Sequence, residues 1–256
     1  MFYKTRIKDT DKVVVLTGAG ISAESGIKTF RDSDGLWEEH SIEDVATPQG
    51  FRNDSHLVWD FYTARFEQLK EVSPNPGHTA LAELERHLGD NFLLVTQNID
   101  GLHLQAGSKR VLEMHGSVRN SFCNKCGHTI STSEVLEKRT EYKDFNKSER
   151  ITKKDRFWFK CTECSGFFRP DIVWFGEMPY HLDEIMEKLQ QCTFFLVIGT
   201  SGVVYPAAQF LMIAKQRGAR TIGVNLEPPE NRSFLDEFHQ GKAGEMVPKL
   251  VSKWIS

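Results

Sequence analysis

The sequence predicts an α/β fold, a doubly wound parallel sheet that carries a small second module. Two observations predict the sheet: the strand candidates are short and continuously apolar, and helical patterns alternate with them. A third observation predicts the module, because four of the five cysteines form two close pairs. With 256 residues, of which 39% are hydrophobic, the chain can bury a large core without disulfides.

The strand candidates share a run of apolar residues that is typical of strands covered on both faces. They are Val13–Thr17, Phe92–Thr96, Phe194–Ile198 and Thr221–Asn225. The helix candidates between them, and one aromatic segment, show helical spacing or have proline at the start and glycine after the end. They are Pro76–Leu88, Leu182–Leu189, Pro206–Arg217 and the aromatic Leu57–Leu69.

Charge and apolar runs exclude several classes of protein. The net charge of −3 provides no positive field for a polyanion, so we expect no nucleic-acid partner. The apolar run Val13–Leu16 is shorter than the roughly seven residues of a signal peptide and the roughly 20 of a spanning helix. We therefore expect a cytoplasmic protein with reduced thiols and no membrane partner. Separately, we expect it to be a monomer. Basic residues outnumber acidic ones in Val135–Lys160, which indicates a solvated excursion or a surface for an acidic partner.

A glycine-rich loop follows the first strand candidate directly. Gly18 and Gly20 permit a tight turn and let backbone N–H groups approach a pyrophosphate, and Ser22 adds a hydroxyl. A tight strand-to-helix connection without a ligand is the alternative. The long loop that follows contains aromatic side chains, which either cover a cofactor or anchor the loop in the core.

Four cysteines form two pairs of the C-x2-C type, Cys123 with Cys126 and Cys161 with Cys164. Four thiolates can surround Zn²⁺ tetrahedrally, and with all positions filled by sulfur the metal is structural rather than catalytic. A redox pair or unrelated core cysteines are the alternatives. Residues 127–160 exceed the usual spacing between zinc knuckles, so we expect them to form an excursion. Cys192 lies beside an apolar strand and is expected to be a core residue.

Polar side chains follow the carboxyl ends of the strand candidates, where α/β sheets bind ligands. They include Gln97, Asn98 and Asp100 after the second strand, and the segments Gly199–Ser201 and Asn225–Glu227 after the later two. Amides, hydroxyls and carboxylates there suit a carboxamide and ribose hydroxyls. His115 stands next to glycine and can act as a general base near neutral pH, or be a structural histidine.

The ordered set of motifs resembles the sirtuin family of NAD-dependent protein deacylases, most closely its bacterial class III branch. The motifs are GAGIS-x-x-SGI-x-x-FR, TQNID-x-LH, E-M-HG, the two cysteine pairs, VWFGE, GTS and NLE. The similarity runs from about residue 10 to 250. Lys28-Thr29 stands where many sirtuins have proline, a departure that fits the class III pattern.

The resemblance implies two domains, with NAD and acyl-lysine meeting between them. Residues 1–116 and 173–256 would form a Rossmann-type NAD-binding domain with a helical insertion at about 38–75, and residues 117–172 a zinc-binding module. The residues that match NAD contacts are Gly18, Ala19, Gly20, Ser22, Phe30, Arg31, Trp37, Gln97, Asn98, Ile99, Asp100, Gly199, Thr200, Ser201, Asn225, Leu226, Glu227 and Ala243.

The resemblance also implies the chemistry. The acyl carbonyl oxygen would attack C1′ of the nicotinamide ribose, and His115 would then take a proton from a ribose hydroxyl. The products would be nicotinamide, O-acyl-ADP-ribose and free lysine. Val173–Glu177, including Val173, Phe175, Gly176 and Glu177, matches the stretch that pairs with the backbone of an acyl-lysine protein or peptide.

Tyr62 and Arg65 are three residues apart in the aromatic helix candidate and project from one face. A guanidinium beside a phenol suits a carboxylate, and the matching pair in class III sirtuins recognises succinyl and malonyl groups. A core tyrosine with a surface arginine is the alternative. Two other functions remain open: a silent NAD or ADP-ribose sensor, which would not need His115, and an ADP-ribosyltransferase.

Overall fold

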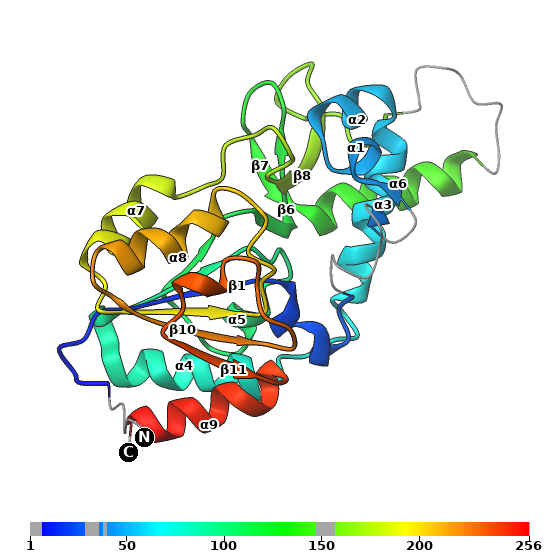
Figure 1. The fold of residues 1–256 in the computed structure, drawn as a ribbon. Helices are drawn as coiled ribbons and strands as arrows, with labels where there is room; N and C mark the ends of the chain where they lie inside the picture. The colour runs from blue at the N-terminus through cyan, green and yellow to red at the C-terminus, as the bar shows by residue number, and fades with distance from the viewer. Residues whose placement is uncertain (1–6, 29–35, 38–39, 147–156, 256) are drawn as a thin grey trace. The chain divides into compact units, whose positions relative to one another are not determined.

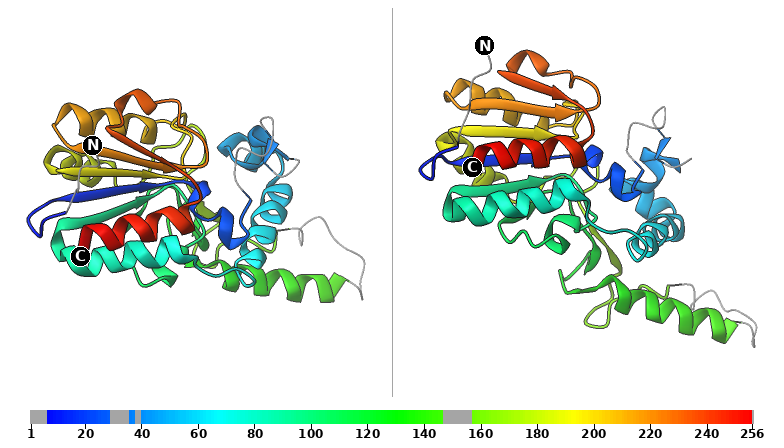
Figure 2. Two further views of the ribbon diagram at one scale, coloured as in Figure 1. Left: turned by 60° about the horizontal axis from the view of Figure 1, so that its bottom comes forward. Right: turned by 90° about the horizontal axis from the view of Figure 1, so that it is seen from below.

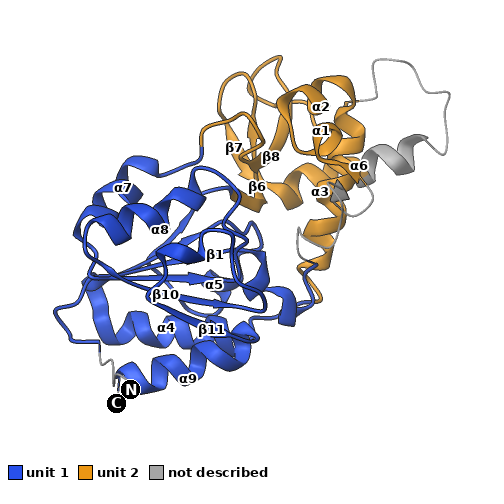
Figure 3. Cartoon of the chain, viewed as in Figure 1, with its two compact units in different colours: residues 1–34, 72–115, 179–256 blue, residues 35–71, 116–178 orange. Residues whose placement is uncertain are grey.

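The computed structural model describes residues 7–28, 36–37, 40–146 and 157–255 and divides the chain into two compact units (Figure 3). Unit 1 comprises residues 1–34, 72–115 and 179–256, and unit 2 comprises residues 35–71 and 116–178. Within the described ranges, no helix combines the length and the apolar character needed to cross a bilayer.

The described part of unit 1 contains one six-stranded sheet in which every neighbouring pair is parallel (Figure 1). This confirms the predicted α/β fold with a doubly wound parallel sheet. The spatial order of the strands is β11 (Glu237–Gln240), β10 (Arg220–Asn225), β9 (Phe194–Ile198), β1 (Val13–Thr17), β4 (Phe92–Thr96) and β5 (Val111–Glu113).

Helices cover both faces of this sheet. Alternate residues of each strand point to opposite faces, so each strand contributes apolar side chains to both layers. Val13 and Val15 of β1 belong to one apolar cluster, together with residues of α4 (Pro76–Leu88) and α9 (Ala243–Ile255). Figure 2 shows α4 and α9 side by side. Val14 and Leu16 of β1 belong to a second cluster, with residues of α7 (Leu182–Gln191) and α8 (Ala207–Gln216). The continuous apolar runs of the sequence therefore reflect burial on two faces.

The two edge strands and the last helix of unit 1 were not predicted. β5 has three residues, all half-buried, and β11 has a single apolar residue, Phe238, so neither shows the apolar run of a central strand. α9 does show a helical signal, because Val247, Leu250, Val251 and Trp254 are buried at helical spacing. Pro248 lies inside this helix.

Unit 2 has a three-stranded antiparallel sheet of β7 (Thr129–Ser131), β6 (Gly116–Cys123) and β8 (Phe168–Ile172). It also contains a two-stranded ribbon of β2 (Leu36–Trp37) and β3 (His40–Ser41). Its helices are α1 (Ile42–Val45), α2 (Pro48–Asn53), α3 (Ser55–Gln68) and α6 (Thr132–Asn146). The expected excursion between the cysteine pairs thus begins with β7 and α6.

Residues 35–71 belong to unit 2, whereas the family resemblance implies a helical insertion at about 38–75 within the Rossmann-type domain. The physical reason is the aromatic side of α3. Trp59 is fully buried, its Nε1 donates to the carbonyl of Phe168 in β8 at 3.2 Å, and its ring packs on Trp158 and Phe159. α3 begins at the cap Asp54, whose side chain accepts a bond from the Leu57 amide.

Candidate functional site

The carboxyl edge of the unit 1 sheet contains a topological switch point. From β1 the chain proceeds to β4 and β5 on one side, whereas β9, β10 and β11 extend the sheet on the other side. Ligands of open α/β sheets bind where the strand order reverses in this way. The loops that leave β1 and β9 here are the glycine loop and the segment Gly199–Ser201, both predicted to contact NAD.

These two loops are in direct backbone contact, which requires glycine on both sides. The amide of Gly20 donates to the carbonyl of Gly199 at 2.8 Å. A Cβ on Gly20 would lie 2.7 Å from Gly199 Cα, and Gly199 has a φ of +63°. After Gly18 the chain turns through two short 3-10 segments, Ala19–Ile21 and Ala23–Ser25. Gly20 and Gly199 therefore serve the close approach of two loops.

A buried polar network lies beneath the glycine loop. The Ser22 hydroxyl donates to Asp100 Oδ2 at 2.7 Å and accepts a bond from Asn98 Nδ2 at 3.1 Å. Asn98 Nδ2 also contacts the carbonyl of Gly18 at 3.2 Å. All three side chains of this network are buried. The structure thus brings together the predicted residues Ser22, Asn98 and Asp100, with the Ser22 hydroxyl engaged inside the protein.

The remaining predicted NAD residues of unit 1 follow the ends of the neighbouring strands. Gln97 Nε2 donates to Thr200 Oγ1 at 3.2 Å, and Asn225 Nδ2 donates to the Thr200 carbonyl at 2.9 Å. Thr200 therefore connects the ends of β4, β9 and β10. Among the others, Ile99 and Ser201 are half-buried, Leu226 and Glu227 are exposed, and Ala243 is buried. Phe30 and Arg31 lie outside the described residues, and Trp37 lies in β2 of unit 2.

His115 is oriented by a backbone carbonyl. Its Nδ1 lies 3.1 Å from the oxygen of Gln97. Because a carbonyl can only accept, the neutral ring carries its proton on Nδ1, and the basic lone pair is on Nε2. Burial lowers the pKa of His115 from 6.5 more than the bond to Gln97 raises it. The side chain is therefore a neutral base at pH 7.

Sequence reasoning missed a second histidine of this region. His78 of α4 is fully buried. Its Nδ1 accepts a hydrogen bond from the Asn75 amide at 3.3 Å, and its Nε2 lies 3.4 Å from the Ser22 hydroxyl oxygen. Burial lowers its pKa from 6.5 to about 4. Its ring centroid is 4.8 Å from that of His103, which bonds Thr17. The signal in the sequence was weak, because His78 occupies the first turn of a helix, 19 or more residues from the polar strand ends.

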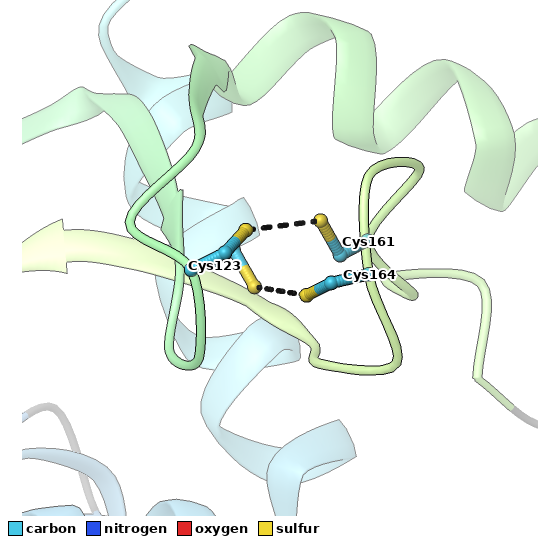
Figure 4. Close-up of side chains that lie close together, drawn as sticks. Cys123, Cys161 and Cys164 are labelled. Carbon is cyan, nitrogen blue, oxygen red and sulfur yellow. Dashed lines mark hydrogen bonds between the residues drawn. The ribbon is translucent and has the colours of Figure 1, made fainter.

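The four paired cysteines form one cluster in unit 2 (Figure 4). Their Sγ atoms all lie within 4.8 Å of one another; the distance is 3.5 Å for Cys123 and Cys164 and 3.8 Å for Cys126 and Cys161. Tetrahedral Zn²⁺ with bonds of about 2.3 Å needs sulfur atoms roughly 3.8 Å apart. Backbone amides also point at the sulfurs, as at Cys164, which accepts from Gly166 at 3.2 Å. The donor set fits a structural zinc ion.

The predicted acyl-binding pair lies in unit 2 as well. Tyr62 is fully buried, and its hydroxyl accepts a bond from Trp174 Nε1 at 3.1 Å. Burial raises the pKa of Tyr62 well above its usual value, so the phenol stays neutral. Arg65 is 9% exposed, donates to the Phe61 carbonyl at 2.7 Å and lies over the Phe61 ring. Both side chains are thus buried, and the alternative of a surface arginine is wrong.

The stretch Val173–Glu177 forms a turn directly after β8. The Trp174 amide donates to Glu177 Oε2, the Glu177 amide to the Trp174 carbonyl, and the Phe175 amide to the carbonyl of Ala46. Gly176 has a φ of +90°, which favours glycine. Phe175 is 46% exposed.

Comparisons with known proteins give one consistent result. Residues 18–206 match the Sir2 family. An NAD-dependent protein deacylase of Salmonella typhimurium is 46% identical over 100% of this chain and 89% of its own length. The protein of the same name in Shewanella oneidensis is 48% identical over 93% of this chain and 92% of its own length.

Solved structures agree with these relatives. The crystal structure of a Sir2 homologue–NAD complex has a TM-score of 0.81 at 39% identity and covers 97% of this chain and 92% of its own. The structure of Sir2Af2 bound to a myristoylated histone peptide has a TM-score of 0.70 at 38% identity and covers 96% and 92%.

Proposed function

The chain belongs to the Sir2 family and is an NAD-dependent protein-lysine deacylase, and on that premise we propose that it removes succinyl and malonyl groups as well as acetyl groups from lysine. NAD is the co-substrate, and Zn²⁺ is a structural ion held by the four cysteines of unit 2. The substrates are acyl-lysine proteins or peptides. We further propose that the protein is a cytoplasmic monomer.

The NAD contacts that we propose for unit 1 are those at the switch point. The glycine loop would lie against the phosphates, which its small residues would allow to approach the backbone closely. The amides of Gln97 and Asn98 and the carboxylate of Asp100 would hold the nicotinamide and its ribose, and Gly199–Ser201 with Asn225–Glu227 the adenosine half. Bound NAD supplies a glycosidic bond whose cleavage releases nicotinamide and makes the ribose carbon reactive towards the acyl oxygen.

His115 would be the catalytic base. Its Nδ1–H is directed to the Gln97 carbonyl, which leaves the lone pair of Nε2 to accept a proton from a ribose hydroxyl. The lowered pKa supports this role, because the ring starts neutral at physiological pH. Loss of the proton turns the hydroxyl into a nucleophile towards the acyl carbon. Departure of the lysine amine and addition of one water molecule then complete O-acyl-ADP-ribose.

The observation that supports an acidic acyl group is the buried cation of α3. Arg65 carries its charge at a position that is 9% exposed, one helical turn from the neutral phenol of Tyr62. A sheltered guanidinium favours an anionic group nearby, since its charge is weakly screened there. A fork of N–H donors with an added hydroxyl matches the two oxygens of a carboxylate.

Arg65→Met tests this acyl preference. We expect kcat/KM for a succinyl-lysine peptide to fall roughly 30- to 150-fold, since loss of a charged contact costs about 2–3 kcal/mol, while kcat/KM for the acetyl peptide changes little. Arg119→Met, an exposed arginine of β6 in the same unit, is the matched control and should alter neither. Equal losses on both peptides in Arg65→Met would overturn the carboxylate role.

Mass spectrometry separates deacylation from the two other functions. With NAD and an acyl peptide, a deacylase yields nicotinamide and O-acyl-ADP-ribose. His115→Tyr should abolish O-acyl-ADP-ribose and limit nicotinamide release to at most one molecule per enzyme, because the base acts after nicotinamide leaves. A silent sensor would release no nicotinamide with either protein. An ADP-ribosyltransferase would leave the ADP-ribose on a protein instead of in a small product.

A further inference from the structure

Arg169 is a buried charged residue at the centre of a polar cluster in unit 2. It lies in β8 and is 6% exposed. Its partner Glu177 comes eight residues later, at the end of the Val173–Glu177 turn. The cluster is local to unit 2 and lies outside the NAD-binding residues proposed for unit 1.

The contact between the two side chains is bidentate. Arg169 Nη1 lies 2.6 Å from Glu177 Oε1, and Arg169 Nη2 lies 2.8 Å from Glu177 Oε2. Nη2 also donates to the carbonyl of Ile172, the last residue of β8, at 2.6 Å. Glu177 Oε2 in turn accepts the amide of Trp174 at 2.9 Å. The ion pair therefore connects both ends of the turn to the strand that precedes it.

The same guanidinium orients an indole. Arg169 Cζ lies 3.3 Å from the ring centroid of Trp174, which is 2% exposed. A planar cation on an aromatic face is attracted by the ring and restrains its orientation. On its other edge, Trp174 Nε1 donates to the Tyr62 hydroxyl at 3.1 Å. A chain of contacts thus runs from Glu177 through Arg169 and Trp174 to Tyr62.

This chain of contacts determines the direction in which the Tyr62 hydroxyl can donate a hydrogen bond. Because the indole N–H fills one acceptor direction of the hydroxyl oxygen, the hydroxyl proton is directed away from Trp174. Trp174 has one N–H, so the orientation of its ring decides where that bond is made. Arg169 holds the ring by stacking and holds the backbone of Trp174 through Glu177.

We propose that Arg169 is a positioning residue for acyl-lysine binding, which fixes the Val173–Glu177 turn and, through the Trp174 ring, the hydroxyl of Tyr62. The inference rests on the proposed function in one respect, that the acyl-lysine contacts this turn and Tyr62. Arg169 itself does not contact substrate. Its effect should appear in the binding of the acyl peptide and not in the binding of NAD.

Arg169→Lys and Glu177→Gln test the proposal. Lysine keeps the charge but loses the fork and the flat stacking surface, so we expect KM for an acetyl-lysine peptide to rise tenfold or more. In Glu177→Gln one acceptor oxygen remains, so a rise of about three- to tenfold is expected. For both variants kcat at saturating peptide should change less than KM, and the Kd of NAD, measured by calorimetry, should match wild type.

The split between KM and kcat distinguishes positioning from a general loss of structure. Partial unfolding lowers the amount of active protein, which reduces the apparent kcat and leaves KM unchanged. Arg139→Lys is the matched control, because Arg139 of α6 also pairs with a carboxylate, Asp60, and lies 5.3 Å from the Trp158 ring in the same unit. It should leave the peptide KM within twofold of wild type.

A double-mutant cycle of Arg169→Lys with Tyr62→Phe tests the route through Trp174. If Arg169 acts on Tyr62, the two changes in the succinyl-to-acetyl preference should be less than additive. An unchanged peptide KM in Arg169→Lys, or a kcat loss with constant KM, would overturn the proposal. A raised acetyl KM in Arg169→Lys together with equal losses in Arg65→Met would retain the role of Arg169 and reject the preference for acidic acyl groups.

Discussion

His115 shows how one backbone contact selects a proton donor and a proton acceptor on the same ring. The Gln97 carbonyl lies at the end of β4, and its bond to Nδ1 fixes the tautomer. Burial makes the charged ring costly, so the neutral form persists at pH 7. This geometry supports the role of a base that we propose for His115.

The pH dependence of kcat/KM follows from this geometry. Burial lowers the pKa of His115 below 6.5. In the proposed mechanism the neutral ring is the active form, so kcat/KM should be flat above pH 7 and should fall as the pH drops through that lowered pKa. Initial rates with an acetyl peptide between pH 5 and 9 measure it. A midpoint at or above pH 7 would contradict the assigned environment.

At the scale of the elements, the stability of the two C-x2-C knuckles should depend on bound zinc. We expect Cys161→Ser to lower the zinc content from one ion per chain towards zero, because the fourth thiolate ligand is lost. The thermal midpoint should fall as well, since metal binding contributes to folding. Elemental analysis and thermal melts measure both. Cys192→Ala, a buried cysteine packed against the unit 1 sheet, is the control and should keep its zinc. A full zinc content in Cys161→Ser would contradict the four-cysteine site.

The glycine loop is the element most sensitive to added volume. In Gly20→Ala the new Cβ would meet the backbone of Gly199 at 2.7 Å, so one loop must shift. Such overpacking costs about 1–3 kcal/mol of folding stability. The shifted loop should also weaken NAD binding, measured by calorimetry. Ala23→Gly, in the next turn of the same loop, removes volume and should have a smaller effect. Unchanged NAD affinity in Gly20→Ala would argue against a contact between this loop and NAD.

For the whole molecule, the buried histidines link stability to pH. The folded protein binds a proton at His78 only near pH 4, whereas the unfolded chain binds one near pH 6.5. The unfolded state therefore takes up more protons in this window, and the free energy of unfolding should decrease as the pH falls below 6.5. The full loss amounts to about 3 kcal/mol at pH 4. His103, whose pKa burial also lowers, adds to the same trend.

Urea unfolding between pH 5 and 7.5 measures this linkage. In His78→Gln the slope of the unfolding free energy against pH should become shallower, because one of the linked protons is removed. His181→Gln, at an exposed position, should keep the slope of wild type. Identical slopes in all three proteins would show that His78 is not buried in its neutral form.

The sequence by itself determined the central architecture of this protein. β1, β4, β9 and β10 were recognisable because burial on both faces of a sheet requires an uninterrupted apolar run. The zinc ligands were recognisable because two knuckles need fixed local spacing. Polar strand ends and ordered motifs indicated the family and the chemistry.

Only the tertiary structure decided which distant residues meet. Short edge strands such as β5 and β11 are set by the neighbour with which they pair, so local composition does not mark them. The assignment of 35–71 to unit 2 depends on Trp59 meeting β8, and the bond between Trp174 and Tyr62 joins residues 112 positions apart. Local patterns record how each segment is buried, whereas long-range contacts depend on chain topology, which no single segment encodes.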